Sequence, residues 1–297
     1  MPGRDLHDSL HRKLFSYTEA FRDFIENSFP AAILQHLETA NLAQDNTSYV
    51  DENLQKHFSD VVYNCPLASG ESVKVSILIE HKSWQPKYPH LQLLRYMINI
   101  WEYQQKNKQS LTPILPLLIY HGKKEWQHRP FEEYFPDVPE ALLESLPHFD
   151  FMLTDLAKMS EAEIKERYTS LMVQVTFRLM KQSHDTEKMK AHLDKVLKEA
   201  EGLASEVGTR QLFLALLHYI LRLTDLSAGA FEQKLTYLSP IIKKEIMSTY
   251  ENLIEKGRKE GMEKGMEKGR KEGREEGREE GREEGMEKGR EEGREEG

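Results

Sequence analysis

The stretch 73-VKVSILIEHKSW-84 is the most informative part of the chain, because an apolar run typical of a protein core ends there in ionisable side chains. A short apolar run without turn residues is typical of a buried β-strand, and here it consists of Val75, Ile77, Leu78 and Ile79. Glu80, His81 and Lys82 follow it directly. The sequence therefore predicts a buried strand that carries charged groups at its end.

A second strand precedes this one across a predicted hairpin. The segment 58-FSDVVYNC-65 has the composition of a strand, and the connection 66-PLASGES-72 contains proline, serine and glycine, which are typical of hairpin turns. A hairpin centred near Ser69–Glu71 places Asp60 opposite Glu80 to within one or two residues. Lys82 projects from the same face as Glu80, about 6 to 7 Å further along, if the strand continues.

Two neighbouring carboxylates raise each other's pKa unless a cation lies between them. Divalent cations such as Mg²⁺ are held by one or two carboxylates together with water and substrate phosphates. A metal ion between Asp60 and Glu80 would activate water for attack on phosphorus, and Lys82 would orient that water or neutralise the transition state. Taken alone, a Glu-x-Lys pair at a strand end is more often a surface ion pair.

Periodicity along the chain predicts a mixed α/β core over residues 1–130. The predicted order is helix, three strands, helix, strand, with a polar loop at 41–47, and the predicted segments are residues 1–40, 48–54, 58–65, 73–80, 89–107 and 113–122. Residues 131–253 are first rich in loops and then helical, which predicts a helical lobe that packs on the core or merely follows it. Such an order is typical of a layered α/β domain.

Composition restricts the class of protein. The 297 residues contain no run of about 18 to 20 apolar residues and no signal-like apolar segment at the start, so we expect no membrane contact and a cytoplasmic location. The single cysteine, Cys65, excludes an internal disulfide and lies in a predicted strand, which favours a buried thiol over a nucleophile.

Positive charge is concentrated in one part of the chain, although the net charge is -9. Residues 81–130 hold 8 Lys and Arg against 2 Asp and Glu, whereas residues 1–80 hold 6 against 12. A phosphate backbone requires such local charge, so we expect DNA to contact this basic segment. The candidate DNA-binding residues are Lys87, Arg95, Lys123 and Lys124. A solvated surface without a partner explains the same counts.

The tail, residues 254–297, repeats a glycine at every fourth position. Each glycine inside a helix costs about 1 kcal/mol relative to alanine, and a four-residue step leaves no fixed apolar seam. The sequence predicts a frayed helix or a disordered segment that keeps the protein soluble. Self-association through the tail or the helical lobe, giving a homo-oligomer, is the alternative.

The order of an Asp, then Glu-x-Lys on the next strand, then a helix, resembles the PD-(D/E)XK nuclease superfamily. More narrowly, the chain resembles the Rpn family of recombination-promoting nucleases, also called YhgA-like putative transposases. The resemblance covers roughly residues 5–230 and rests on these segments: 7-HD-8, 59-SDVVY-63, 78-LIEHKS-83, 93-LLRYM-97, 100-IW-101, 119-IYHG-122 and 154-TDL-156. The chemical role of the first of these does not follow from the sequence.

This resemblance implies a divalent-metal-dependent DNA endonuclease that cleaves phosphodiester bonds and promotes recombination. Asp60 and Glu80 would bind Mg²⁺ or another divalent cation, with the main-chain carbonyl of His81 as a third ligand. Lys82 would be the catalytic lysine, and Gln92 would face the site from the following helix. Ser59 stands where the superfamily has proline, a change that affects the backbone more than the chemistry.

Two other classes of function stay open at this point. The chain could be a DNA- or partner-binding protein of a mobile element that keeps a degenerate nuclease fold and associates through its tail. It could also be a structural interaction protein built on its helices, which explains the tail but not Asp60, Glu80 and Lys82. His121 could approach the same site, although a histidine at a strand end is more often a structural hydrogen-bonded residue.

Overall fold

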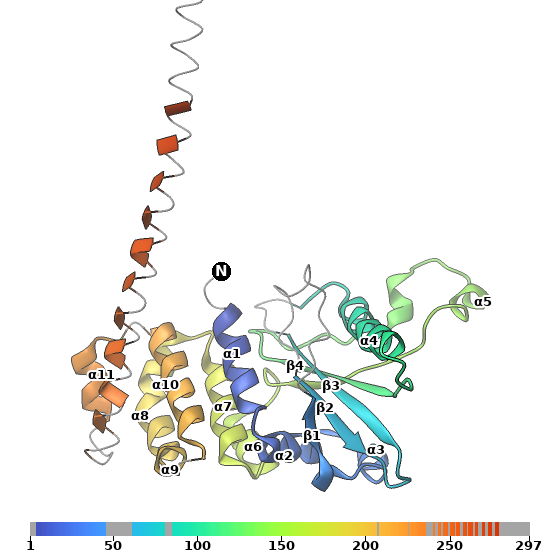
Figure 1. Cartoon of the computed structure of the whole chain (residues 1–297), viewed down its shortest axis with the longest axis horizontal. Helices are drawn as coiled ribbons and strands as arrows, with labels where there is room; N and C mark the ends of the chain where they lie inside the picture. Colours follow the sequence, from blue (N-terminus) through green and yellow to red (C-terminus); the bar gives the residue numbers. More distant parts are fainter. Residues whose placement is uncertain are drawn as a thin grey trace, which may run out of the picture. The chain divides into compact units, whose positions relative to one another are not determined.

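A computed structural model provides the fold of the chain. It describes residues 4–45, 61–80, 85–206, 208–224 and 226–235, together with separate positions between 240 and 278. The chain divides into two compact units, Met1–Ile242 and Lys243–Gly297. The first unit contains both the sheet and the helical lobe (Figure 1).

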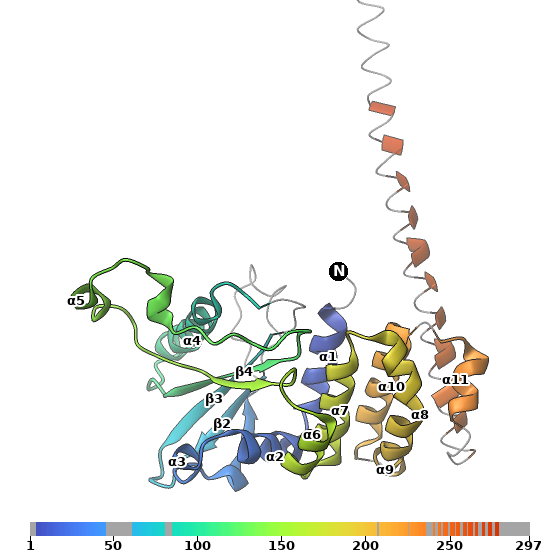
Figure 2. The same ribbon diagram turned by 180° about the vertical axis from the view of Figure 1, so that it is seen from behind.

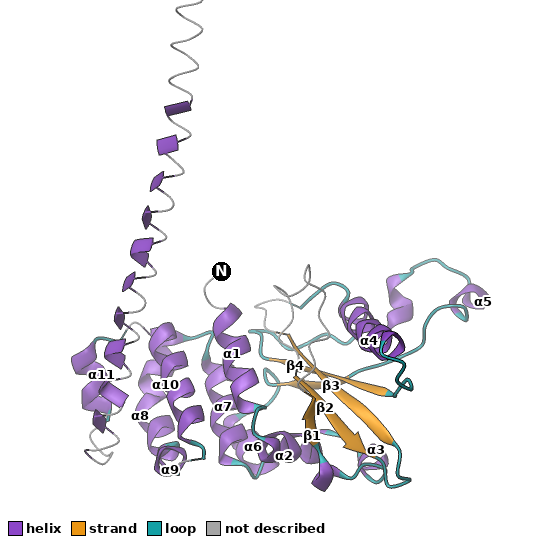
Figure 3. Ribbon diagram, viewed as in Figure 1, coloured by secondary structure: helices purple, strands orange, loops and turns teal. Residues whose placement is uncertain are grey.

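The sheet has the strand order β1-β2-β3-β4-β5 in the described part of the chain (Figure 3). The pairs β1–β2 and β2–β3 are antiparallel, whereas the pairs β3–β4 and β4–β5 are parallel. Antiparallel strands can be joined by a short turn, as β2 and β3 are, whereas parallel strands need crossovers, which here contain α4 and the segment between β4 and β5. The strands are β1 (Ala43–Asp45), β2 (Val61–Pro66), β3 (Ser72–Glu80), β4 (Ile114–Tyr120) and β5 (Met152–Asp155).

The predicted hairpin is confirmed in its described part. Strand β2 pairs with β3 from Val61↔Ile77 to Pro66↔Ser72, so Ser69 lies at its centre. Gly70 has a φ of +89°, a conformation that side chains with a β-carbon rarely adopt, and this explains the glycine in the turn.

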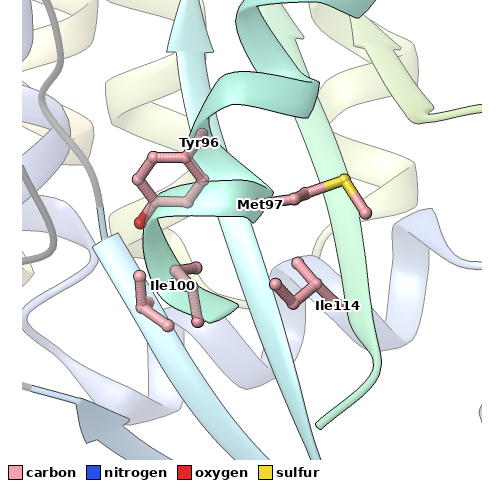
Figure 4. Packing of buried hydrophobic residues seen from close by; sticks show 5 residues of the cluster. Tyr96, Met97, Ile100 and Ile114 are labelled. Carbon is pink, nitrogen blue, oxygen red and sulfur yellow. The ribbon is translucent and has the colours of Figure 1, made fainter. Parts of the chain in front are cut away.

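Helix α4 (Pro89–Lys106) covers one face of the sheet and begins at a proline in its first turn, as predicted. Its buried side chains pack on β2 and β4 in an apolar cluster (Figure 4) that consists of Val62, Tyr96, Met97, Ile100 and Ile114. A second cluster toward the end of β4 consists of Leu93, Leu118, Tyr120, Trp126 and Phe151. The aromatic residues Tyr96, Tyr120 and Trp126 are buried in these two clusters.

The opposite face of the sheet packs on the helical start of the chain, where Phe15 and Phe21 contact Tyr63. The helices of this start are α1 (Arg4–Leu14), α2 (Thr18–Ser28) and α3 (Ala31–Leu34), and they confirm the predicted helical start. The ring of Phe21 stacks on Tyr63, and the Tyr63 hydroxyl donates a hydrogen bond of 2.8 Å to the main-chain oxygen of Phe15. Since Val62 faces α4, its neighbour Tyr63 faces the other side, and the sheet lies between two helical layers.

The helical lobe packs on the core through α1, which lies against α7 and α10 (Figure 2). Its helices are α6 (Glu161–Arg167), α7 (Leu171–Gln182), α8 (Thr186–Glu199), α9 (Glu201–Ser205), α10 (Arg210–Thr224) and α11 (Ala228–Lys234). One hydrogen bond illustrates the contact, because His7 of α1 is bonded to the Tyr219 hydroxyl of α10. Among the described residues, no helix is both long and apolar enough to cross a membrane.

The sequence misassigned two parts of the sheet. Strand β1 lies within the segment 41–47 that was predicted as a polar loop, and it forms because its backbone pairs with β2. Strand β5 lies in the segment predicted as loops, so the sheet continues beyond residue 130. The strand predicted at 48–54 lies outside the described residues. Two single-turn elements, η1 (Thr39–Asn41) and η2 (Phe131–Tyr134), and the short α5 (Glu140–Leu143) complete the first unit.

The second unit contains the glycine-rich tail. Its described positions are helical, and from 251 to 278 every one of them is exposed. Lys259 and Glu255 form an ion pair of 2.8 Å one turn apart. Such a pair stabilises an exposed helix by only about 0.3 to 0.5 kcal/mol.

Candidate functional site

Three parallel strands end at the same level of the sheet. In the register of the strands, Glu80 is the partner of Tyr120, and Tyr120 is the partner of Asp155. We call these three residues the carboxyl edge. Ligand sites of α/β sheets are most often found beyond the carboxyl ends of parallel strands.

The predicted metal and catalytic residues meet this edge at Glu80. Asp60, His81 and Lys82 lie outside the described residues, and for Glu80 the structure describes the backbone. The predicted contact between the carboxylates of Asp60 and Glu80 therefore stays a prediction. Among the described residues, no group of three or more His, Cys, Asp or Glu side chains is placed to hold a metal ion.

Gln92 and the predicted DNA-binding residues are described. Gln92 is half-buried in the first turns of α4, one residue before Leu93, whose side chain packs with Tyr120 of the carboxyl edge. The four basic residues are exposed, as binding to a phosphate backbone requires: Lys87, Arg95, Lys123 and Lys124. Lys123 and Lys124 follow β4 directly, and Lys87 and Arg95 lie before and within α4.

Asp155 holds the loop that follows β4. Its carboxylate accepts hydrogen bonds from the main-chain nitrogens of Trp126 (2.7 Å) and Ala157 (2.9 Å). The side chain is buried, and its charge adds to burial in raising the pKa of Tyr120. Asp155 thus fixes residues 121–126 beside the end of β5, which gives a structural reason for the segment 154-TDL-156.

The segment 119-IYHG-122 has a steric reason for its glycine. A β-carbon at Gly122 would overlap the side chain of Tyr120, which is buried against Trp126 with ring centroids 5.1 Å apart. The chain therefore turns away from the sheet at a residue without a side chain. This geometry carries His121 and Lys123 beyond the carboxyl edge.

A stack of histidines connects this turn to the helical lobe. The ring of His121 lies 5.0 Å from that of His7 and 5.7 Å from that of His184, measured between centroids. His184 donates a hydrogen bond from Nε2 to the main-chain oxygen of His121. His7 is hydrogen-bonded to the Tyr219 hydroxyl at 2.8 Å.

The stack gives the segment 7-HD-8 a structural role, since His7 links α1 to both the sheet and α10. The main-chain oxygen of His121 accepts the bond from His184, and its ring stacks with two histidines, so the predicted hydrogen-bonding role of the His121 side chain stays a prediction. Neither His184 nor Lys181 was considered from the sequence. Their positions depend on the packing of the α7–α8 connection, and no local pattern marks them.

Cys65 is buried, as expected. Burial, and to a lesser extent the charge of Glu38, raise the pKa of its thiol to about 11. The thiolate is the reactive form of cysteine. The sulfur is therefore protonated at neutral pH and acts as a small apolar group in β2.

Comparison with known proteins identifies what the chain is similar to. The family model of the YhgA-like putative transposases matches residues 5–208. The inactive recombination-promoting nuclease-like protein RpnE of Escherichia coli K12 is 24% identical over 258 residues, which cover 85% of this chain and 83% of the relative.

Two further relatives are named as nucleases. The recombination-promoting nuclease RpnD of Escherichia coli O157:H7 is 23% identical over 253 residues, covering 83% of this chain and 93% of RpnD. The recombination-promoting nuclease RpnA of Escherichia coli K12 is 24% identical over 257 residues, covering 85% of each chain. No solved structure matches the chain.

Proposed function

The chain belongs to the family of YhgA-like putative transposases, and from this premise we propose that it is a divalent-metal-dependent DNA endonuclease that promotes recombination. Its similarity to two proteins named as recombination-promoting nucleases supports the class of reaction. The register of the β2–β3 hairpin is the observation that carries the assignment of residues. It pairs Val61, the neighbour of Asp60, with Ile77, three residues before Glu80.

The proposed metal ligands are the carboxylates of Asp60 and Glu80 and the main-chain carbonyl of His81. These donors are all oxygen atoms, which Mg²⁺ prefers. When bound, such an ion lowers the pKa of water and neutralises charge that develops on phosphorus oxygens. Glu80 ends a strand that pairs with β2 as far as Ile77 and with β4 up to Glu80 itself, so its backbone is held beside Tyr120 for this role.

Lys82 is proposed to orient the attacking water and to neutralise the transition state. Gln92 is proposed to contact the same phosphate or water from α4. The exposed cations Lys87, Arg95, Lys123 and Lys124 are proposed to hold the DNA backbone on either side. The whole set would cleave a phosphodiester bond at the carboxyl edge.

The test is nicking of supercoiled plasmid DNA in the presence of Mg²⁺ or Mn²⁺. We expect Asp60→Ala and Lys82→Ala each to reduce the rate about 100-fold or more, since each removes a group that acts on transition-state charge. Lys195→Ala, which removes an exposed cation from α8, is the control and should keep the wild-type rate. Nicking that survives in both site variants would reject the assignment.

A second function is favoured by one observation, the name of RpnE as an inactive nuclease-like protein. On this alternative the chain keeps the fold and binds DNA or a partner without cleaving it. Binding of DNA by the wild type, with no nicking in any divalent metal, would support it. Nicking that depends on Asp60 and Lys82 would exclude it.

A further inference from the structure

An open pocket of about 530 Å³ lies beyond the ends of β4 and β5. The pocket is lined by residues that follow β4 and β5 and by residues around the α7–α8 connection. The lining residues used below are His121, Lys123, Ala157, Lys181, His184 and Asp185. All of them belong to the first compact unit. The volume falls in the range of about 300 to 1,000 Å³ that is usual for pockets binding small ligands.

Two lysines give this pocket a positive charge. Lys123 is exposed and forms no ion pair with any residue in the described part of the chain. Lys181 donates hydrogen bonds of 3.1 and 3.2 Å to the main-chain oxygens of Leu156 and Ala157. These neutral acceptors fix the position of the ammonium group without neutralising it, and one of its three N–H donors can still reach a ligand.

The two lysines outnumber the single carboxylate in the lining, Asp185, so the pocket keeps a positive charge. Asp185 caps α8, because its side chain accepts a hydrogen bond of 2.9 Å from the main-chain nitrogen of Lys188. His184 is held by its bond to the main-chain oxygen of His121, and its ring stacks on the His121 ring at an interplanar angle of 24°. The pocket thus contains one positioned cation, Lys181, one exposed cation, Lys123, and a fixed imidazole.

The pocket also lies next to the carboxyl edge. His121 and Lys123 are one and three residues beyond Tyr120, the strand partner of Glu80. Three residues span at most about 11 Å, which corresponds to about three nucleotides at the rise of a DNA strand. A strand cleaved at the carboxyl edge would therefore bring a neighbouring phosphate to Lys123.

We propose that this pocket binds a phosphate group of a nucleic-acid strand one to three nucleotides from the cleaved bond, through Lys123 and Lys181, with the imidazole of His184 in its lining. The distance to the cleaved bond rests on the proposed nuclease function, whereas the anion site itself does not. The phosphate could be internal to the strand or terminal. The chemistry of recognition is the same in both cases, because each presents oxygen acceptors to charged donors.

The first measurement is the affinity of the full chain for a short labelled DNA duplex in EDTA, which removes divalent metals and prevents cleavage. We expect Lys123→Ala to weaken binding about fivefold and to reduce the slope of log affinity against log salt by about 1. Lys123→Arg should restore both quantities, and Lys123→Glu should weaken binding further. Circular dichroism should verify that each variant is folded.

The matched control is Lys195→Ala, which removes an equally exposed cation from α8, nine residues after Thr186. That separation is about 13 Å along the helix axis, so this variant should stay within about twofold of the wild type. Equal effects of Lys123→Ala and Lys195→Ala on affinity and slope would overturn the proposal.

Calorimetry with thymidine 5′-monophosphate and with thymidine then identifies the source of the phosphate. Monophosphate binding that Lys123→Ala abolishes, without thymidine binding, supports a site for terminal phosphates. An effect of Lys123→Ala on the duplex alone supports a site for internal ones. If the plasmid is not nicked but DNA binding depends on Lys123, the proposed nuclease function is rejected and the proposed phosphate site is supported. If the plasmid is nicked and DNA binding does not depend on Lys123, only the proposed phosphate site is rejected.

Discussion

Two buried histidines, His90 and His121, occupy settings that differ in almost everything except burial. Both side chains are 1% exposed. His90 is surrounded by the rings of Phe131, Tyr134 and Phe149, and its Nδ1 is hydrogen-bonded to the Tyr134 hydroxyl at 2.7 Å. His121 is stacked between two other histidines and borders a pocket that also contains Lys123 and Lys181.

The comparison of His90 with His121 shows that burial of a polar residue does not by itself indicate a functional site. Aromatic rings surround His90, and the titratable Asp150, His128 and Glu132 also lie within electrostatic range of it. Its hydrogen bond to Tyr134 joins α4 to the single turn at Phe131–Tyr134, which is a structural role. The neighbours of His121 include Lys123, Lys181 and His184, which line a pocket that is open to solvent. The settings should therefore respond differently to mutation, the first in stability and the second in binding.

The largest expected effect on stability is that of His90→Ala. We expect the free energy of unfolding to fall by about 3 kcal/mol, because the change leaves a cavity among aromatic rings and removes the partner of the Tyr134 hydroxyl. Urea denaturation followed by circular dichroism measures it. His36→Ala, at an exposed position, should change the same quantity by less than about 0.5 kcal/mol. Equal losses in the two variants would show that His90 does not hold the α4 region together.

Asp155→Ala should have the next largest effect, a loss of about 2 kcal/mol in the free energy of unfolding, since it leaves two main-chain N–H groups without their acceptor. Asp150→Ala is the matched control, because the exposed Asp150 accepts, within the described part of the chain, a hydrogen bond only from the adjacent Phe151 nitrogen. An Asp155 variant as stable as the Asp150 variant would mean that the loop after β4 is held by other contacts.

A dependence of stability on pH should follow from both histidine settings. Burial lowers the pKa of His90, and it also lowers the pKa of His184 beside His121. The unfolded chain therefore binds protons, near the usual histidine pKa of about 6.5, that the folded chain does not. Stability should rise with pH through this interval and be lost as the pH falls below it.

Urea denaturation at a series of pH values measures this slope. His90→Phe should reduce it, because one of the two groups no longer titrates, whereas His36→Ala should leave it unchanged. A slope that is identical in wild type and His90→Phe would show that the burial of His90 does not affect its protonation.

The smallest effect is expected from removal of the tail. Every described position from 251 to 278 is exposed, in contrast to both histidine settings, so truncation after Tyr250 removes no buried contact among them. We expect the free energy of unfolding to change by less than about 0.5 kcal/mol. Light scattering should give the same oligomeric state for the full and the shortened chain. A lower state for the shortened chain would instead support association through the repeat.

The parts of the fold that were correctly predicted depend on local signals. The turn residues between β2 and β3, the proline that begins α4 and the apolar run of β4 each indicate their element within a window of about ten residues. Strand β5 was missed because its four residues carry no such signal. It is a strand only because β4 offers it a backbone to pair with.

The sequence alone predicts the hairpin and the helix that follows it, and it makes Asp60, Glu80 and Lys82 candidates because spacing along adjacent strands fixes which residues share a face. Only the tertiary structure brought His7, His121, His184 and Lys181 together beside the carboxyl edge. Residues so far apart in the chain meet because α1 and the helical lobe pack on the sheet, and no local pattern encodes that packing. The residues of the proposed catalytic group are close together in the sequence and could be predicted from it, whereas the residues that line the pocket are far apart in the sequence and could not.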